Sequence, residues 1–308
     1  MRVAIIAALS LLLAAPFTIA QTVQDQANLA ALATVDLKHT AAKSLFGGQK
    51  LPANLASRSI GSYARGCLSG GKSLPVNGPD WQVMRTSRNR NWANPALLNV
   101  IERLARDAKA RDGWNGLMVG DMSQPRGGPM LTGHASHQIG LDADIWFTPM
   151  PDHELTARER ENMVPLEMVK DRSTLNMANW SESRAKLIKT AASYPEVARI
   201  FVHPPIKAEL CRWATGDRSW LAKVRPYFNH TFHFHIRMNC PAGDTICKNQ
   251  WTPAPKDGTG CGEELAYWMG PVPWVKKKRD PNAPPIKPAP PLTLSALPAE
   301  CRAVVTAP

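Results

Sequence analysis

The sequence predicts a mixed α+β fold. One amphipathic helix has clear start and stop signals within 94–113, and short segments near 141–147 and 232–236 alternate apolar and polar residues as strands do. Helices and strands do not follow one another in a regular βαβ rhythm, which favours the α+β class. With 308 residues, the chain can form one large domain or two small ones around a substantial core.

The early elements begin with a glycine-rich stretch at 59–78, which indicates a loop or a short hairpin. The clearest helix then starts at Asn94, a natural N-cap, with Pro95 at the first helical position and Gly113 after the end. One helical stripe carries its apolar residues Leu97, Leu98, Ile101, Leu104, Ala105 and Ala108.

The later elements are predicted from the same signals. Strands are expected at 116–123, 141–147 and 198–203, and helices at about 181–194 and 206–214. From Gly270 onward proline dominates, and we expect no packed helix or strand in this tail. Cys301 lies near its end, so a disulfide back to the body would tie the tail down.

The first twenty residues have the pattern of a secretory signal. A single Arg precedes an apolar run from Val3 to Ala15, and small residues precede Gln21. The run is short for a transmembrane helix, although an uncleaved anchor is the alternative. We therefore expect residues 1–20 to be removed, and the mature protein to lie outside the cytoplasm without stable insertion in a membrane.

The six cysteines form an even set, which in an exported chain predicts disulfides. Sequence spacing alone favours only a local bridge between Cys240 and Cys247, which enclose a short polar loop, and leaves the other pairings open. The formal net charge of +12 suits an anionic wall polymer, anionic lipid or nucleic acid, or it serves solubility alone. Export makes nucleic acid the weakest of these partners.

Three of the eight histidines lie within six residues, at His230, His233 and His235. On an extended strand, His233 and His235 point to the same face. Two neighbouring imidazoles suit a metal ion, or a metal ion and a proton-transfer group. The alternative is a half-exposed strand whose histidines contact only water.

A second cluster lies about 90 residues upstream, where His134, His137, Asp142 and Asp144 fall within eleven residues. Gly140 favours a turn, so that His137 stays on a loop and the next strand delivers Asp144. These two residues and one histidine from the second segment make a set of two histidines and one carboxylate. Such a set is typical of catalytic zinc. Non-haem Fe(II) uses a similar set but fits an exported, disulfide-bonded chain poorly.

The pattern His137-x-x-Gly140-x-x-x-Asp144, followed by His233-x-His235, resembles the LAS group of zinc peptidases. The longer blocks "GHASHQIGLDADIWF" and "HTFHFHIRMNC" look like the penicillin-insensitive murein endopeptidase family, over most of residues 60–270. The resemblance implies a periplasmic protein with a small antiparallel sheet flanked by helices. We therefore expect a zinc endopeptidase domain at 21–275 and, from the proline content, a C-terminal tail at 276–308, which is longer than the family predicts.

The same resemblance implies roles for individual residues. His137, Asp144 and His235 would bind Zn²⁺, and His233 would be the catalytic base or stabilise the transition state. His230 is the alternative base, and His134 and His230 are otherwise accessory, with a second metal position as one option. Three disulfides are implied, and by position they would join Cys67 to Cys301, Cys211 to Cys261 and Cys240 to Cys247.

Three further polar residues are candidates for the site, and two of them have two readings each. Asp171 is either a solvated carboxylate or a ligand of a secondary metal. Arg126, upstream of the ligand loop, either holds a carboxylate of a bound peptide or has no such role. Asp142 is expected to support the ligand Asp144 on the same strand face.

The predicted function is hydrolysis of peptide cross-links of the D-alanyl–diaminopimelate type in peptidoglycan. One alternative is a D,D-carboxypeptidase or dipeptidase that trims free stem peptides, and another is a non-catalytic wall-binding protein. Retention of both histidines of "HFH" argues against the binder, which does not need the second imidazole. The oligomeric state is not predicted.

Overall fold

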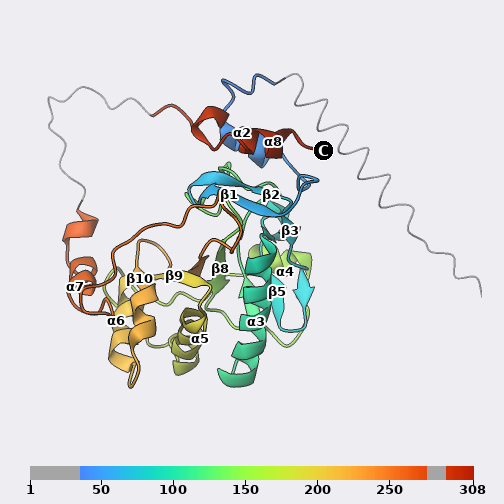
Figure 1. Cartoon of the computed structure of the whole chain (residues 1–308). Coiled ribbons are helices and arrows are strands. Elements are labelled where there is room, and N and C mark those ends of the chain that lie inside the picture. The colour runs from blue at the N-terminus through green and yellow to red at the C-terminus, as the bar shows by residue number, and fades with distance from the viewer. Residues whose placement is uncertain (1–34, 276–288) are drawn as a thin grey trace, which may run out of the picture.

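The computed structural model describes residues 35–275 and 289–308, and it confirms the α+β class. The expected signal at 1–20 lies outside the described residues. A seven-stranded sheet forms the centre of the molecule (Figure 1). The order of its strands is β10-β9-β11-β8-β7-β5-β4. Its strands are β4 (Asn77–Gly78), β5 (Trp81–Val83), β7 (Leu117–Val119), β8 (Asp142–Trp146), β9 (Val197–Val202), β10 (Val224–Pro226) and β11 (His233–Met238).

The middle of this sheet is antiparallel, because β11 pairs antiparallel with both β8 and β9, and β8 pairs antiparallel with β7. The β10–β9 and β5–β7 pairs are parallel. In both parallel pairs the two strands are joined through a helix, α6 (Pro204–Trp213) or α3 (Pro95–Arg111). Parallel neighbours need such a crossover connection, which explains the departure from a fully antiparallel sheet.

The three longest helices, α3, α5 (Glu182–Ser193) and α6, lie together below the strands in Figure 1 and share one apolar core with them. The start of α3 follows its sequence signals. The Asn94 side chain accepts a hydrogen bond from the backbone N–H of Ala96 at 3.0 Å, and Pro95 occupies the first turn.

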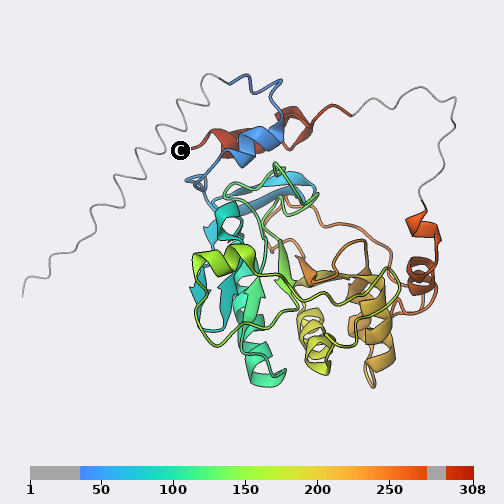
Figure 2. The same cartoon turned by 180° about the vertical axis from the view of Figure 1, so that it is seen from behind.

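A second, smaller core lies at the opposite end of the molecule (Figures 1 and 2). It is formed by α2 (Ala42–Gly47), the hairpin of β1 (Arg58–Ser62) and β2 (Arg65–Ser69), and α8 (Cys301–Thr306). The expectation of a tail without packed structure is therefore wrong for its last part. The short helix η4 (Leu294–Ala296) and α8 return to the body, where Val304 and Val305 are buried.

Three disulfides join the same pairs that the resemblance implies. Cys67 of β2 is bonded to Cys301 of α8, Cys211 to Cys261, and Cys240 to Cys247. The first bond closes a sequence separation of 234 residues and lies in the smaller core. It fastens the end of the chain to the hairpin, as expected for a proline-rich tail.

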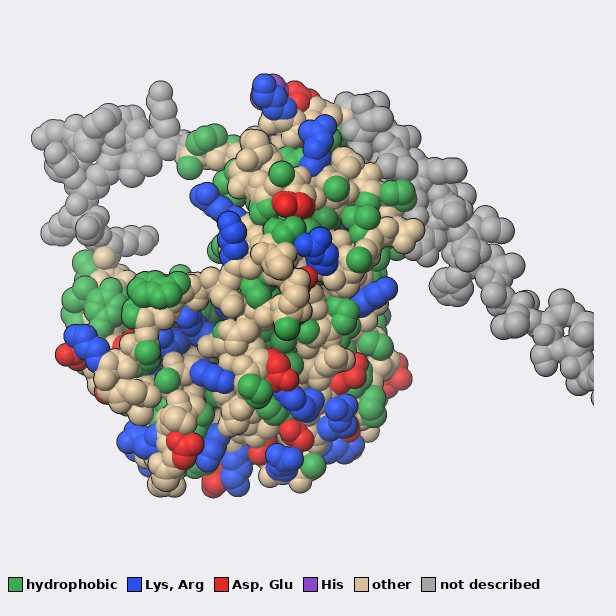
Figure 3. Space-filling model, in the orientation of Figure 1, with side chains coloured by type: hydrophobic (Ala, Val, Ile, Leu, Met, Phe, Trp, Pro, Cys, Tyr) green, Lys and Arg blue, Asp and Glu red, His purple; other side chains and the backbone are tan. Residues whose placement is uncertain are grey.

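The remaining elements are short. They are β3 (Lys72–Ser73) and β6 (Trp92–Ala93), which pair with each other, the helices α4 (Ala157–Asn162) and α7 (Glu263–Met269), and the 3-10 helices η1 (Thr86–Arg88), η2 (Ser219–Lys223) and η3 (Val272–Trp274). Hydrophobic side chains gather over α7 and the turn that follows it (Figure 3). Within 35–275 and 289–308, every helix is too short or too polar to cross a membrane.

Candidate metal centre

The register of two central strands creates the site. His235 of β11 lies directly opposite Asp144 of β8, so their side chains share one face of the sheet. His233 lies on that face too, because side chains alternate along a strand. The intervening residues Phe234 and Ile236 are fully buried in the main core. The polar face of the sheet therefore carries the histidines, as the alternating sequence predicts.

The loop before β8 brings the other two histidines to Asp144. Gly140 has a φ of +70°, and a Cβ at this position would lie 2.8 Å from the backbone nitrogen of Asn94, so the turn requires glycine. His137 also has a positive φ of 67°, which is an uncommon conformation for a residue with a side chain. Its backbone N–H donates to the carboxylate of Asp142 at 2.9 Å, which fixes the loop on the strand.

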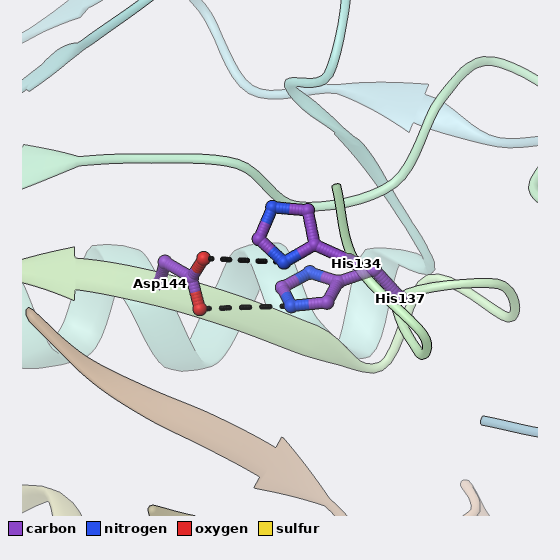
Figure 4. Close-up of side chains that lie close together, drawn as sticks. All are labelled: His134, His137 and Asp144. Carbon is purple, nitrogen blue, oxygen red and sulfur yellow. Dashed lines mark ion pairs between the residues drawn. The ribbon is translucent and has the colours of Figure 1, made fainter. Parts of the chain in front are cut away.

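Four imidazole nitrogens surround the carboxylate of Asp144. They belong to His134, His137, His233 and His235 and lie 3.7, 3.6, 3.6 and 3.4 Å from its oxygens, respectively (Figure 4 draws the first two). These separations are too long for good hydrogen bonds. Ligand atoms at about 2.0–2.2 Å from one tetrahedral Zn²⁺ are ~3.3–3.6 Å apart, which matches the observed spacing.

Burial supports the same interpretation. The Nε2 atom of His137 and the Oδ1 atom of Asp144 are buried and have no hydrogen-bond partner among the described residues. An orphaned buried polar atom costs free energy, and a metal ion between the two atoms would remove this cost. His134, His137 and Asp144 each offer a ligand atom, and these atoms lie within 4.8 Å of one another.

For three of the histidines, the ring nitrogen that faces away from Asp144 has its own hydrogen-bond acceptor. The acceptors are Asp121 for His134 at 2.9 Å, the backbone carbonyl of Met122 for His137 at 3.0 Å, and Asp142 for His235 at 2.9 Å. An acceptor at one nitrogen keeps the proton there and leaves the other nitrogen free for a metal. The three rings are thus held in the tautomer that a ligand needs.

His233 differs from these three histidines. Its Nδ1 atom is buried and has no partner among the described residues, so nothing fixes its tautomer. The ring of His230 lies 5.1 Å from the ring of His233, and the Nδ1–H of His230 donates to the carbonyl of Phe228 at 2.6 Å. Burial lowers the pKa of His230 to about 3 and that of His233 well below its usual value. Both imidazoles are therefore neutral at physiological pH.

The two aspartates of β8 have opposite pKa shifts. Burial raises the pKa of Asp144 to about 6, although neighbouring histidines oppose the shift. Burial alone would also raise the pKa of Asp142, but Arg237 and His235 outweigh it and hold this pKa well below its usual value. Asp142 is thus a fixed anion that supports the site. A metal ion bound beside Asp144 would stabilise the ionised form of that carboxylate as well.

Two expected site residues lie elsewhere. Arg126 is fully buried, and its guanidinium donates to the backbone carbonyls of Leu51, Val304, Val305 and Ala307. It holds the end of the chain against the body, so its assignment to substrate binding is wrong. The sequence could not reveal this role because most of its acceptors lie nearly 180 residues away.

Asp171 is the second residue that lies outside the site. It is exposed on a turn, where its carboxylate accepts hydrogen bonds from the backbone and the hydroxyl of Ser173. It does not belong to the cluster of possible metal ligands found among the described residues. The structure therefore agrees with the solvated reading and not with the metal reading.

Four of the histidines line a groove of about 840 Å³, namely His134, His230, His233 and His235. Aromatic residues, Arg237 and several small or polar residues complete the lining. The aromatic lining consists of Tyr63, Phe201, Tyr227 and Phe228, and Tyr227 and Phe228 pack in turn on Trp268 and Trp274. The groove thus combines imidazoles with aromatic side chains, and it is large enough for several residues of a peptide.

Sequence reasoning missed two residues that support the site, Asp121 and Arg237. Asp121 is hydrogen-bonded to both His134 and Arg90. These contacts outweigh the effect of burial, which alone would raise the pKa of Asp121, and they lower it to about 2. Arg237 could have been found, because it follows His235 by two positions and so shares its strand face. Nothing local marks Asp121, whose role depends on the loop that carries His134.

A sheet that presents histidines and a carboxylate in an open groove has the donor set of a metal-dependent hydrolase. The chain belongs to the penicillin-insensitive murein endopeptidase family, whose profile matches residues 59–306. It is 44% identical over 212 residues to a penicillin-insensitive murein endopeptidase of Haemophilus influenzae, covering 69% of this chain and 73% of that protein. Proteins of the same name from Klebsiella pneumoniae and Salmonella newport are 40% and 42% identical, over 82% and 76% of this chain and 88% and 85% of theirs.

Proposed function

We propose that this protein is a zinc-dependent endopeptidase that hydrolyses D-alanyl–diaminopimelate cross-links of peptidoglycan in the periplasm. One observation carries the metal part of the proposal, namely the set of histidine nitrogens around Asp144 at ligand-to-ligand distances. The family supports the peptidase activity, and the names of the relatives support the murein substrate.

In this proposal His137, Asp144 and His235 hold the zinc ion. All three are buried at the base of the site, whereas the side chain of His134 retains 24% of its exposure and would be an accessory group. When bound, zinc supplies a Lewis acid for the scissile carbonyl and lowers the pKa of the attacking water toward ~7. Asp142 orients His235 and carries the permanent charge that keeps its far nitrogen protonated.

His233 is the proposed general base. Its Nε2 atom lies 3.6 Å from Asp144, and its ring is neutral, so this nitrogen can accept a proton. The same imidazolium then returns the proton to the nitrogen of the leaving amine. For Nε2 to accept this proton, the neutral ring of His233 must carry its own proton on Nδ1, which has no partner among the described residues. His230, whose Nδ1–H is bound to a carbonyl, is the proposed accessory group beside it.

Export completes the proposal. Residues 1–20 would be cleaved as the signal, and the catalytic domain would begin at residue 21. Although the proline-rich segment was expected to begin a separate tail at residue 276, the packing of α8 on the β1–β2 hairpin supports including the end of the chain in the same folded unit. The mass of the protein secreted to the periplasm would test the cleavage site directly.

The test of the activity uses purified cross-linked muropeptide dimers and free stem peptides, with zinc-loaded protein and with a chelator. Chelator-sensitive conversion of dimers to monomers, read by mass spectrometry, is the expected result, and the product masses identify the bond. Trimming of free stem peptides without cleavage of dimers would instead establish a carboxypeptidase. Absence of both reactions would leave a wall-binding protein.

Variants separate the proposed roles. His137→Ala, Asp144→Ala and His235→Ala should lose both zinc and activity. His233→Ala should retain zinc and lose activity by about 10²–10⁴-fold, the usual contribution of a general base. Hydrolysis at the wild-type rate by His233→Ala would refute the mechanism even if the endopeptidase activity is correct.

A further inference from the structure

Three arginines lie beside the metal centre on the same face of the sheet. Arg237 of β11 is paired in register with Arg199 of β9, and it follows His235 by two positions. Arg225 of β10 is paired with Phe201, which stands two positions after Arg199. The face of the sheet that carries the histidines therefore also carries three guanidinium groups, one on each of three neighbouring strands.

Two of these arginines are neutralised by carboxylates. Arg237 donates to Asp142 at 2.8 and 3.2 Å, and Arg225 donates to Glu264 at 2.7 Å. Arg199 lies over the ring of Phe201 at 5.6 Å, and no carboxylate of residues 35–275 or 289–308 is within ion-pair distance of it. The cluster thus has one positive charge more than it has carboxylates.

The position of Arg199 relates it to the groove. Phe201 and Arg237, its neighbours along the strand and across the sheet, both line the groove, and Arg199 is only partly buried. Burial and the charges of Arg225 and Arg237 lower the pKa of Arg199 to about 10, which indicates a locally positive environment. Such an environment favours the binding of an anion.

We propose that Arg199 binds a free carboxylate of the substrate peptide and so sets the position of the scissile amide relative to the histidines. The inference rests on the proposed peptidoglycan endopeptidase function. Arg199 is displaced by two residues along the sheet from the row of His235, which is roughly 7 Å. An extended peptide advances by the same distance in two residues. The recognised carboxylate would therefore lie about two residues from the scissile bond.

The terminal alanine and the diaminopimelate unit of a cross-linked dimer each carry a free carboxylate of the kind that Arg199 would bind. The test compares the unmodified dimer with dimers amidated at one or the other position. The proteins are the zinc-loaded wild type, Arg199→Gln, Arg199→Lys, and Arg158→Gln as a control that removes an exposed charge on α4. Thermal unfolding of each variant establishes that it is folded.

We expect Arg199→Gln to lower kcat/KM for the unmodified dimer by about 10- to 100-fold, chiefly through KM, because a charge-assisted hydrogen bond is lost. Amidation of the recognised carboxylate should cause a similar loss in the wild type and little further loss in Arg199→Gln. Arg199→Lys should recover part of the activity, since it keeps the charge but not the planar fork. Arg158→Gln should behave as the wild type.

The proposal is overturned if the wild type cleaves both amidated dimers as fast as the unmodified dimer, or if Arg199→Gln loses the same factor on all three. The second result would assign Arg199 to packing on Phe201. Calorimetric titration of the three dimers into His233→Ala gives the same comparison without turnover. If the wild type cleaves no dimer, the endopeptidase proposal fails, and the titration still decides whether the protein recognises a carboxylate.

Discussion

Asp142 is the residue whose replacement should affect both the metal centre and the stability of the fold. Its carboxylate is fully buried and accepts hydrogen bonds from His235 at 2.9 Å, from the backbone N–H of His137 at 2.9 Å, and from Arg237 at 2.8 and 3.2 Å. Asp142→Asn keeps the shape, but its NH₂ group would face donors and the charge of Arg237 would stay buried without its partner. We therefore expect two separate losses.

The first loss is in metal affinity. Groups that orient a ligand histidine typically contribute 10–100-fold, so zinc should bind Asp142→Asn about 10–100-fold more weakly. The second loss is in stability. Removal of one member of a buried ion pair costs about 3–5 kcal/mol, which should appear in the free energy of unfolding of the metal-free protein. Competition with a chromophoric chelator measures the first quantity, and urea unfolding measures the second.

The matched control is Asp152→Asn, which removes a carboxylate whose side chain is 94% exposed. It should change neither quantity. If Asp142→Asn binds zinc with the affinity of the wild type, Asp142 does not orient His235 toward a metal, and the reasoning about the tautomers fails. If only the stability is unchanged, the ion pair with Arg237 is weaker than its burial indicates.

Three further predictions concern the disulfides, the pH dependence of stability and the removal of metal. The chain-entropy relation gives about 5 kcal/mol for the Cys67–Cys301 bond and about 2.5 kcal/mol for the Cys240–Cys247 bond, so replacement of the first pair by alanine should lower the urea midpoint more. Burial lowers the pKa of Lys207 to about 7, whereas an unfolded lysine titrates near 10.4. Between these two pH values the unfolded state therefore binds more protons than the folded state. The free energy of unfolding should therefore rise from pH 7 toward pH 10, by at most ~1.4 kcal/mol per unit, and Lys207→Met should abolish this slope. Removal of metal by a chelator should lower the melting temperature, and zinc at about 100 times its dissociation constant should restore ~2.7 kcal/mol; an unchanged melting temperature would contradict a metal site.

Local signals explain why α3 and the two central strands could be predicted from the sequence. The cap at Asn94, the proline at position 95 and the apolar stripe act within a few residues, and the structure places α3 at Pro95–Arg111. The alternation around Asp144 and His235 likewise needs no distant information. The meeting of β8 and β11 could not be derived from periodicity; it was indicated only by the metal-ligand set that the two segments would form together and by the resemblance to a family.

The errors concern residues whose environment comes from distant parts of the chain. The proline content of the tail predicts no packing, yet α8 packs because Cys301 is bonded to Cys67 and because α2 and the hairpin supply an apolar surface. Arg126 stands among glycines and prolines that are typical of an exposed loop, but it is buried by the same returning segment. One long-range contact, between the end of the chain and the hairpin, thus explains both mistakes.

The core and the face that carries the histidines also depend on one another through the register of β11. Phe234 and Ile236 are fully buried on one side, while His233, His235 and Arg237 face the groove. A shift of the strand by one residue would place the polar side chains in the core and the apolar ones in water, at a cost far greater than any single contact in the site. Hydrophobic burial therefore fixes which histidine stands opposite Asp144, and the hydrogen bonds to Asp142 and Asp121 then need only to orient rings that the core has already placed. For this reason we expect substitutions in the apolar row of β11 to lower zinc affinity and stability together.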